Sequence, residues 1–149
     1  MSGGTTALII AFGFLLVFPL FWMAIVWLLS GLSGWRTLAR HYGYSGALPR
    51  TQHQYQYLSM GYNRIFMMRY NLIANISVDE SYLYLSVMRI FSIGNKPLRI
   101  PLADLDVSDV NMSFLKSKCV RAARATNIRI HLSTRLVKKL EAGQMALQT

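Results

Sequence analysis

The spacing of hydrophobic residues changes along the chain, and each change predicts a different kind of element. Residues 7–29 form an unbroken apolar run, ALIIAFGFLLVFPLFWMAIVWLL. A helix rises about 1.5 Å per residue, so this run would cover roughly 35 Å, enough to cross a hydrocarbon core about 30 Å thick. A cleaved signal peptide would need a basic N-terminal region and a shorter apolar core. We therefore expect residues 1–30 to form a permanent transmembrane anchor.

Within this anchor, large side chains recur at helical spacing. Phe14, Phe18, Phe21 and Ile25 share one face of the predicted helix. Such a face can dock another membrane helix, and contact with lipid alone is the alternative. The run contains no ionisable residue, so it supplies no proton relay, ion site or cofactor ligand.

A short amphipathic segment follows the anchor. Residues 35–42, WRTLARHY, place Trp35 and other apolar side chains on one helical face, and Arg36 and Arg40 on another. Helices of this kind lie in the membrane interface, where tryptophan is also enriched. We expect Trp27, Trp35, Arg36 and Arg40 to form an interfacial anchor within a neck of residues 31–53; an ordinary connecting turn is the alternative.

From residue 54 the hydrophobic period approaches two, which is typical of β-strands. The clearest hairpin joins residues 72–78 to residues 82–91 through an acidic turn. Pro101 confines the next extended stretch to a sheet edge or a strand end. Ile128 and Ile130 alternate with outward residues, among which His131 is predicted to be solvated. Further strand residues are expected at Tyr55, Tyr57, 65–68, 107–112, 119–123 and 128–132.

The period returns to that of a helix after Ser133, a good N-cap residue. Leu136, Val137 and Leu140 make an apolar stripe, Lys138 and Lys139 are expected in the last turn, and Gly143 is well placed to end the helix. The predicted fold class is therefore α+β: a transmembrane helix, then an antiparallel β domain over residues 54–149 with a C-terminal helix across one end.

Charge is distributed unevenly between these parts. Residues 1–35 contain no Lys, Arg, Asp or Glu, so the whole formal charge of +10 lies in the remainder. Basic residues beside a membrane span stay on the cytoplasmic side. The sequence therefore predicts that the N-terminus faces outward and that the β domain is cytoplasmic.

The basic residues near the C-terminus form the second candidate site. We expect them to converge with the neck arginines on the side facing the membrane, where arginine forks bind phosphate groups well. Charge bias and solubility are the alternative. The predicted basic patch comprises Arg121, Arg124, Arg129, Arg135, Lys138 and Lys139, with Lys116 and Lys118 nearby. Recognition of nucleic acid is not expected, because the domain has no motif for it.

The sequence contains few residues in patterns typical of catalytic or metal-binding sites. The histidines lack the spacing of metal ligands, and Cys119, the single cysteine, excludes an internal disulfide and any Cys-based zinc site. Asp104, Asp106 and Asp109 lie close together but not at the spacing of a calcium loop. We expect no catalytic residue, no metal and no cofactor.

Several stretches resemble small bacterial pleckstrin-homology-like domains, namely YLYLSV, PLRIPLADL and IRIHLSTRLVKKLE. The neck SGWRTLARHY joined to this pattern is similar to uncharacterised single-pass bacterial membrane proteins. The resemblance implies a split β-barrel capped by a helix, a fold that works mainly as a binding platform. It also implies a bacterial inner membrane as the location.

These features favour a non-enzymatic accessory subunit of a larger inner-membrane complex, of respiratory or photosynthetic type. The helix would pack against that integral membrane complex, and the basic domain would clamp its cytoplasmic face. The alternative is a membrane-tethered module that binds anionic lipid headgroups. An enzyme is a third hypothesis, which would need a pocket that combines Asp104, Asp109 and a histidine.

Overall fold

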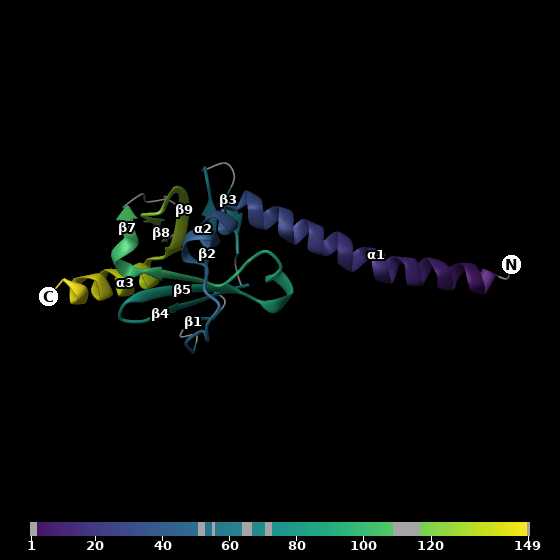
Figure 1. The fold of residues 1–149 in the computed structure, drawn as a ribbon, viewed down its shortest axis with the longest axis horizontal. Helices are drawn as coiled ribbons and strands as arrows, with labels where there is room; N and C mark the ends of the chain where they lie inside the picture. Colours follow the sequence, from purple (N-terminus) through teal and green to yellow (C-terminus); the bar gives the residue numbers. More distant parts are fainter. Residues whose placement is uncertain are drawn as a thin grey trace.

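The computed structural model describes residues 3–50, 53–54, 56–63, 67–70, 73–108 and 117–148. Its class is α+β, as predicted: a long apolar helix, two antiparallel sheets and a C-terminal helix. Figure 1 shows helix α1 projecting from one end of the β domain, with helix α3 at the other end. Tyr55, Ile65 and Phe66, which the sequence assigns to early strands, lie outside the described residues.

Helix α1, Gly3–Leu32, is 30 residues long and carries Pro19 inside it. It is long and apolar enough to cross a membrane, as its sequence predicts. Only Val26 and Ser30 are buried along its length, because the rest of the helix extends away from the domain. The domain therefore leaves most of the helix's apolar surface uncovered.

Helix α2, Trp35–Tyr42, packs into the β domain. Trp35 and Leu38 are 0% exposed and Tyr42 is 5% exposed. The prediction that this apolar face lies in the membrane interface is wrong, because its side chains are buried against the β domain. The neck therefore contributes part of the domain's own core.

The first sheet has the strand order β1-β4-β5-β6. The predicted hairpin is present, with Asp79 Oδ1 accepting hydrogen bonds from the backbone N–H groups of Ser81 and Tyr82 in the turn. Strand β6 is an edge strand that ends at Pro101, in agreement with the position of that proline. The strands are β1 (His53–Gln54), β4 (Ala74–Val78), β5 (Tyr82–Val87) and β6 (Leu98–Pro101).

The second sheet has the order β3-β2-β9-β8-β7. All of its strand pairs are antiparallel, and β9 lies at its centre. The strands are β2 (Leu58–Gly61), β3 (Met67–Arg69), β7 (Leu105–Ser108), β8 (Ser117–Ala122) and β9 (Ala125–Ser133).

Several predicted strands differ from those observed. Tyr57 precedes β2 and lies in no strand. The strand expected over residues 82–91 ends at Val87, and a 3-10 helix, η1 (Arg89–Phe91), follows it. The strand expected over residues 107–112 starts earlier, as β7, beyond a second 3-10 helix, η2 (Leu102–Asp104); residues 109–112 lie outside the described residues. At η1 the backbone hydrogen bonds of Phe91 to Met88 and of Ser92 to Arg89 replace those of a strand.

Helix α3, Thr134–Leu147, buries the predicted stripe of Leu136, Val137 and Leu140. The prediction that Gly143 ends the helix is wrong. Gly143 lies inside it, where a Cβ would come 2.8 Å from Leu102 Cδ1, so the glycine serves close packing. Because the helix continues to Leu147, Lys138 and Lys139 lie in its middle and not in its last turn. Ser133 is at the N-cap position, as predicted, but its side chain makes no capping hydrogen bond.

A continuous core joins both sheets with α2 and α3. Ile128, Ile130 and Leu132 of β9 are 0% exposed, which confirms the predicted inward face. His131 was expected to be solvated, but it is 2% exposed. It lies between Ser59 of β2 and Cys119 of β8, its cross-strand neighbours, and all three are buried. The outer face of this central strand is thus covered at His131, whereas Asn127 on the same face is exposed.

We expect Gly34→Ala to destabilise the protein more than Gly94→Ala. Both glycines have a left-handed backbone, which costs other residues about 1–2 kcal/mol. At Gly34 a Cβ would also lie 2.9 Å from Ile128 Cδ1, which adds an overpacking cost of about 1–3 kcal/mol. At Gly94 the nearest atoms are 3.5 Å away, an ordinary contact.

Thermal unfolding in detergent measures the difference. Gly4→Ala, which would meet nothing within 4 Å, is the neutral control. Equal melting temperatures for the Gly34 and Gly94 variants would contradict the close packing of Gly34 against Ile128 of β9.

Candidate functional site

The exposed part of α1 carries a ladder of aromatic rings. The ring centroids of Phe14 and Phe18 lie 5.3 Å apart, and those of Phe18 and Trp22 lie 6.5 Å apart. Phe21, which the sequence places on the same face, is 62% exposed and takes no part in these stacks, whereas Ile25 is half-buried against the domain. The predicted face therefore divides into an exposed aromatic part and a part that meets the domain.

The predicted interfacial residues also separate into two groups. The Arg36 guanidinium lies over the Trp27 ring, 3.9 Å from its centroid, and Trp27 is 50% exposed. Arg40 is exposed on α2. Trp35 instead lies inside the domain, where its Nε1–H donates a 2.8 Å hydrogen bond to the Lys96 carbonyl. An indole that is fully buried cannot anchor in lipid, so the assignment of Trp35 is corrected.

A buried polar network joins α1 to the β domain. The Ser30 hydroxyl donates to the Gly94 carbonyl (2.7 Å), and the Ser33 hydroxyl donates to the Ser30 carbonyl (3.1 Å). The Tyr70 hydroxyl donates to Ser33 Oγ (2.7 Å), and its ring packs against Trp35 with centroids 5.3 Å apart. Burial raises the pKa of Tyr70 above its ordinary value. We call these five residues the joint.

Sequence reasoning missed the joint. Ser30 and Ser33 follow the apolar run among glycines, a composition typical of a flexible connection, yet each is 0% exposed. Their distant partners, Gly94 and Tyr70, are identified only by the fold, because neither periodicity nor spacing links them. A pair of serines three residues apart at the end of a span was the available signal.

An apolar crevice of about 130 Å³ lies where the last turns of α1 face the domain. Trp22 contacts Phe91 across it, with ring centroids 6.0 Å apart. The remaining walls come from both sides and include Val26, Leu29, Met68 and Ile73. The helix and the domain thus share an apolar surface beyond the joint.

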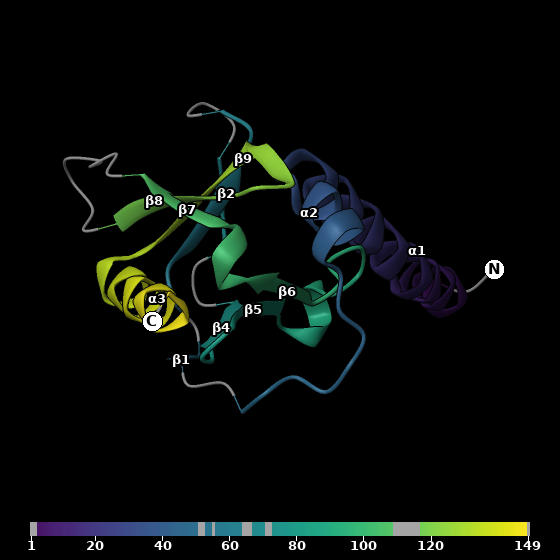
Figure 2. The same cartoon turned by 60° about the vertical axis from the view of Figure 1, so that its left-hand side comes forward.

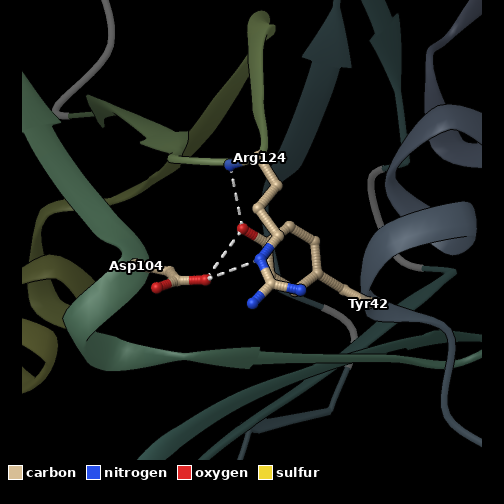
Figure 3. Close-up of polar contacts among 3 residues, drawn as sticks. All are labelled: Tyr42, Asp104 and Arg124. Carbon is tan, nitrogen blue, oxygen red and sulfur yellow. Dashed lines mark hydrogen bonds and ion pairs between the residues drawn. The ribbon is translucent and has the colours of Figure 1, made fainter.

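A polar cluster ties α2 to two loops of the domain, as Figure 3 shows. The Tyr42 hydroxyl donates to Asp104 Oδ2 (3.1 Å) and accepts a hydrogen bond from the Arg124 backbone N–H (3.1 Å). The Arg124 side chain lies 3.8 Å from Asp104 Oδ2. The pKa of Tyr42 is raised, mainly by burial and further by Asp104.

The cluster borders a cavity of about 240 Å³. His41, Tyr82 and Arg99 also line this cavity. The Arg99 guanidinium is held over the rings of Tyr44 and Tyr82, at 4.7 and 4.8 Å from their centroids. The groups that face this cavity are thus engaged with one another, an arrangement that holds α2 in place.

The predicted basic patch is dispersed. Arg135, Lys138 and Lys139 lie on α3, at the end of the domain opposite α1, so they cannot converge with the neck arginines (Figure 1). Arg121 and Arg129 line a separate hollow on β8 and β9, and Arg124 belongs to the cluster with Asp104. Lys118 forms an ion pair with Glu141 (3.0 Å), and Lys116 lies outside the described residues.

The candidate chemical groups remain separate. Among the described residues, no three His, Cys, Asp or Glu side chains gather in a way that could hold a metal ion. Asp104 is engaged with Tyr42, Asp106 is exposed, and Asp109 lies outside the described residues. Cys119 is buried, and burial raises the pKa of its thiol, which disfavours the reactive thiolate.

Comparison with known proteins identifies no relative: no protein-family model, no curated protein and no solved structure matches this chain. The site must therefore be interpreted from its own geometry.

We expect Tyr42→Phe to destabilise the protein by about 1–3 kcal/mol, because it removes the partner of Asp104 and of the Arg124 N–H. Tyr44→Phe is the matched control. Its hydroxyl makes an exposed 3.3 Å contact with the Ala47 carbonyl, so its loss should change stability by less than about 0.5 kcal/mol. Denaturant unfolding of the two variants compares them, and equal stability would contradict a structural role for the cluster.

Proposed function

We propose that α1 spans the bacterial inner membrane once, with the N-terminus outside and the β domain in the cytoplasm. Its 30 residues carry no charge, whereas Arg36 and Arg40 follow it directly. The stacking of Arg36 on the half-exposed Trp27 supports an interface at this level, since tryptophan favours headgroup depth and arginine favours anionic lipid.

We propose further that the protein is a non-enzymatic accessory subunit of a larger inner-membrane complex. The observation that carries this proposal is the joint, which fixes the direction of α1 relative to the β domain. A module that only needs to stay near lipid can use a flexible tether. An accessory subunit would contact its partner through α1 within the bilayer and through the β domain outside it. If the joint already fixes the angle between α1 and the domain, less conformational entropy is lost on binding and the affinity is higher.

The exposed ladder of Phe14, Phe18 and Trp22 is the proposed docking face on the membrane side. Stacked rings have little rotamer freedom left to lose, so they are suited to packing against another helix. The partner is therefore an integral membrane protein of a respiratory or photosynthetic type of assembly. The cytoplasmic contribution comes from the β domain, and neither nucleic acid nor a cofactor enters the proposal.

A pleckstrin-homology-like platform is the fold that we propose for this domain. Two antiparallel sheets around one core, with a helix after the last strand, support that assignment. The Tyr42–Asp104 cluster holds α2 against the domain, and such a rigid surface suits binding better than catalysis.

Anionic lipid is the second candidate partner. It is favoured by Arg36, Arg69, Arg89 and Lys96, which belong to segments that meet the end of α1, rather than by the dispersed C-terminal basic residues. Each such cation near an anionic leaflet contributes about 1 kcal/mol. Gentle solubilisation and native mass analysis separate the candidates: a large co-purifying assembly supports the subunit, and a lone protomer that binds anionic liposomes supports the lipid module.

We expect Tyr70→Phe to reduce the yield of the co-purifying complex, because it removes a buried hydrogen bond of the joint and lets α1 change direction. Tyr62→Phe is the control, since it deletes an exposed 2.7 Å hydrogen bond to Thr37 of α2 by the same chemical change. Spin-label distances between α1 and α3 should broaden only in the Tyr70 variant. If the distance distribution broadens in the Tyr70 variant but the yield of the complex is unchanged, a fixed direction of α1 is not needed for binding and the proposed clamp is wrong.

Topology can be tested independently of any partner. We expect a maleimide that cannot cross the membrane to label Gly4→Cys from the periplasmic side of intact cells, because the N-terminus faces outward. Met145→Cys on α3, where the native side chain is 68% exposed, should react only after the cells are opened. The reverse pattern would overturn the proposed orientation.

A further inference from the structure

The connection between β5 and β6, Met88–Lys96, lies along α1, and we call it the β5–β6 loop. It touches the helix at two levels. The Gly94 carbonyl accepts a hydrogen bond from the Ser30 hydroxyl, and the Phe91 ring packs against the Trp22 ring. Figures 1 and 2 both show this connection on the same side of the domain as α1. The loop therefore extends from the domain along the helix, towards its N-terminal half.

The two contacts fix how far the loop reaches. Eight residues separate Trp22 from Ser30, which corresponds to about 12 Å along the helix axis. Trp22 lies seven residues, or about 10 Å along the axis, before Leu29, the end of the apolar run, and the Phe91 ring centroid lies 6.0 Å from that of Trp22. If α1 spans the bilayer, this contact places the loop close to the boundary between headgroups and acyl chains.

The side chains of the loop suit that depth. Ile90 is 64% exposed and Ile93 is 39% exposed, so the fold does not use these apolar surfaces. Arg89 and Lys96, both exposed, flank them in the sequence. Long basic side chains can extend their charged ends to the headgroups while their stems stay in apolar surroundings.

Part of the loop's backbone is paired within the protein. Its carbonyl groups accept hydrogen bonds within the protein at Met88, Arg89, Phe91, Ser92 and Gly94. Asn95, 3% exposed, supplies one of the donors through its side chain, to the Phe91 carbonyl (2.7 Å). An irregular backbone is excluded from the hydrocarbon centre, so these pairs suit the loop to the interface and not to the middle of the bilayer.

We propose that the β5–β6 loop is a second membrane contact, in which Ile90 and Ile93 insert among lipid chains at the boundary between headgroup and acyl region of the inner leaflet, next to the Phe91–Trp22 contact. The proposal rests on the transmembrane position of α1. It adds a monotopic element that keeps the domain at a fixed height above the bilayer. Lipid is the occupant because α1 itself, in contact with the loop, sets the loop's depth.

The test places one fluorescent label at a time on the full-length chain in a Cys119→Ala background. Three sites with similar native exposure are compared: Leu15 (69%) on α1, Ile90 (64%) on the loop, and Met145 (68%) on α3. Each is replaced by cysteine, labelled with NBD, and reconstituted alone into nanodiscs of phosphatidylcholine and phosphatidylglycerol. Lipids with a spin-label quencher near the carbonyl end or near the methyl end of the acyl chain report depth.

We expect the carbonyl-end quencher to remove roughly half of the emission from Ile90→Cys, which corresponds to interfacial insertion. The methyl-end quencher should act most strongly on Leu15→Cys, and neither should affect Met145→Cys. Because the chain is reconstituted without partners, quenching at Ile90→Cys reports contact with lipid.

The two proposals fail in different ways. If Leu15→Cys is quenched but Ile90→Cys behaves like Met145→Cys, the loop does not enter the bilayer, while α1 still does. If Leu15→Cys is not quenched, α1 is not a span, and the proposed function fails together with the loop. Ile93→Cys provides a second position on the loop, and its emission should fall with that of Ile90→Cys.

Discussion

The structure depends on the joint between an apolar helix and a polar domain. Ser30 and Ser33 are buried at the end of α1, where their hydroxyl groups bond to Gly94, Tyr70 and the helix itself. Buried hydroxyl groups without partners would cost roughly 1–3 kcal/mol each, so this geometry is favoured over a loose connection. The direction of α1 relative to the domain and the position of the β5–β6 loop beside α1 both follow from it.

This constraint also organises the charge. Arg36, at the start of α2, is held over Trp27, and Arg89 and Lys96 flank the loop that touches α1. The cations of α3 lie at the opposite end, available to solvent or to a protein partner (Figure 1). A rigid domain thus has α1 at one end and the cations of α3 at the other, which is the arrangement that the proposed clamp requires.

The sequence predictions failed where an amphipathic pattern has two solutions. The apolar face of Trp35, Leu38 and Tyr42 fits a lipid interface as well as a protein core, and it packs into the core. His131 alternates with inward residues, yet the outer face of a central strand can also be covered. A glycine such as Gly143 can end a helix or allow close packing, and here it allows the Leu102 side chain to pack against α3. In each case the deciding neighbour is distant in sequence.

Hydrophobic period and composition were enough to predict the long apolar helix, the charge asymmetry, the hairpin of β4 and β5, the inward face of β9 and the C-terminal helix. These features depend on patterns that act over a few neighbouring residues. The three-dimensional fold was needed to identify the joint, the Tyr42–Asp104 cluster, the dispersal of the basic residues and the position of the β5–β6 loop beside α1. These arise from contacts between residues such as Tyr42 and Asp104, 62 positions apart, which local pattern does not encode.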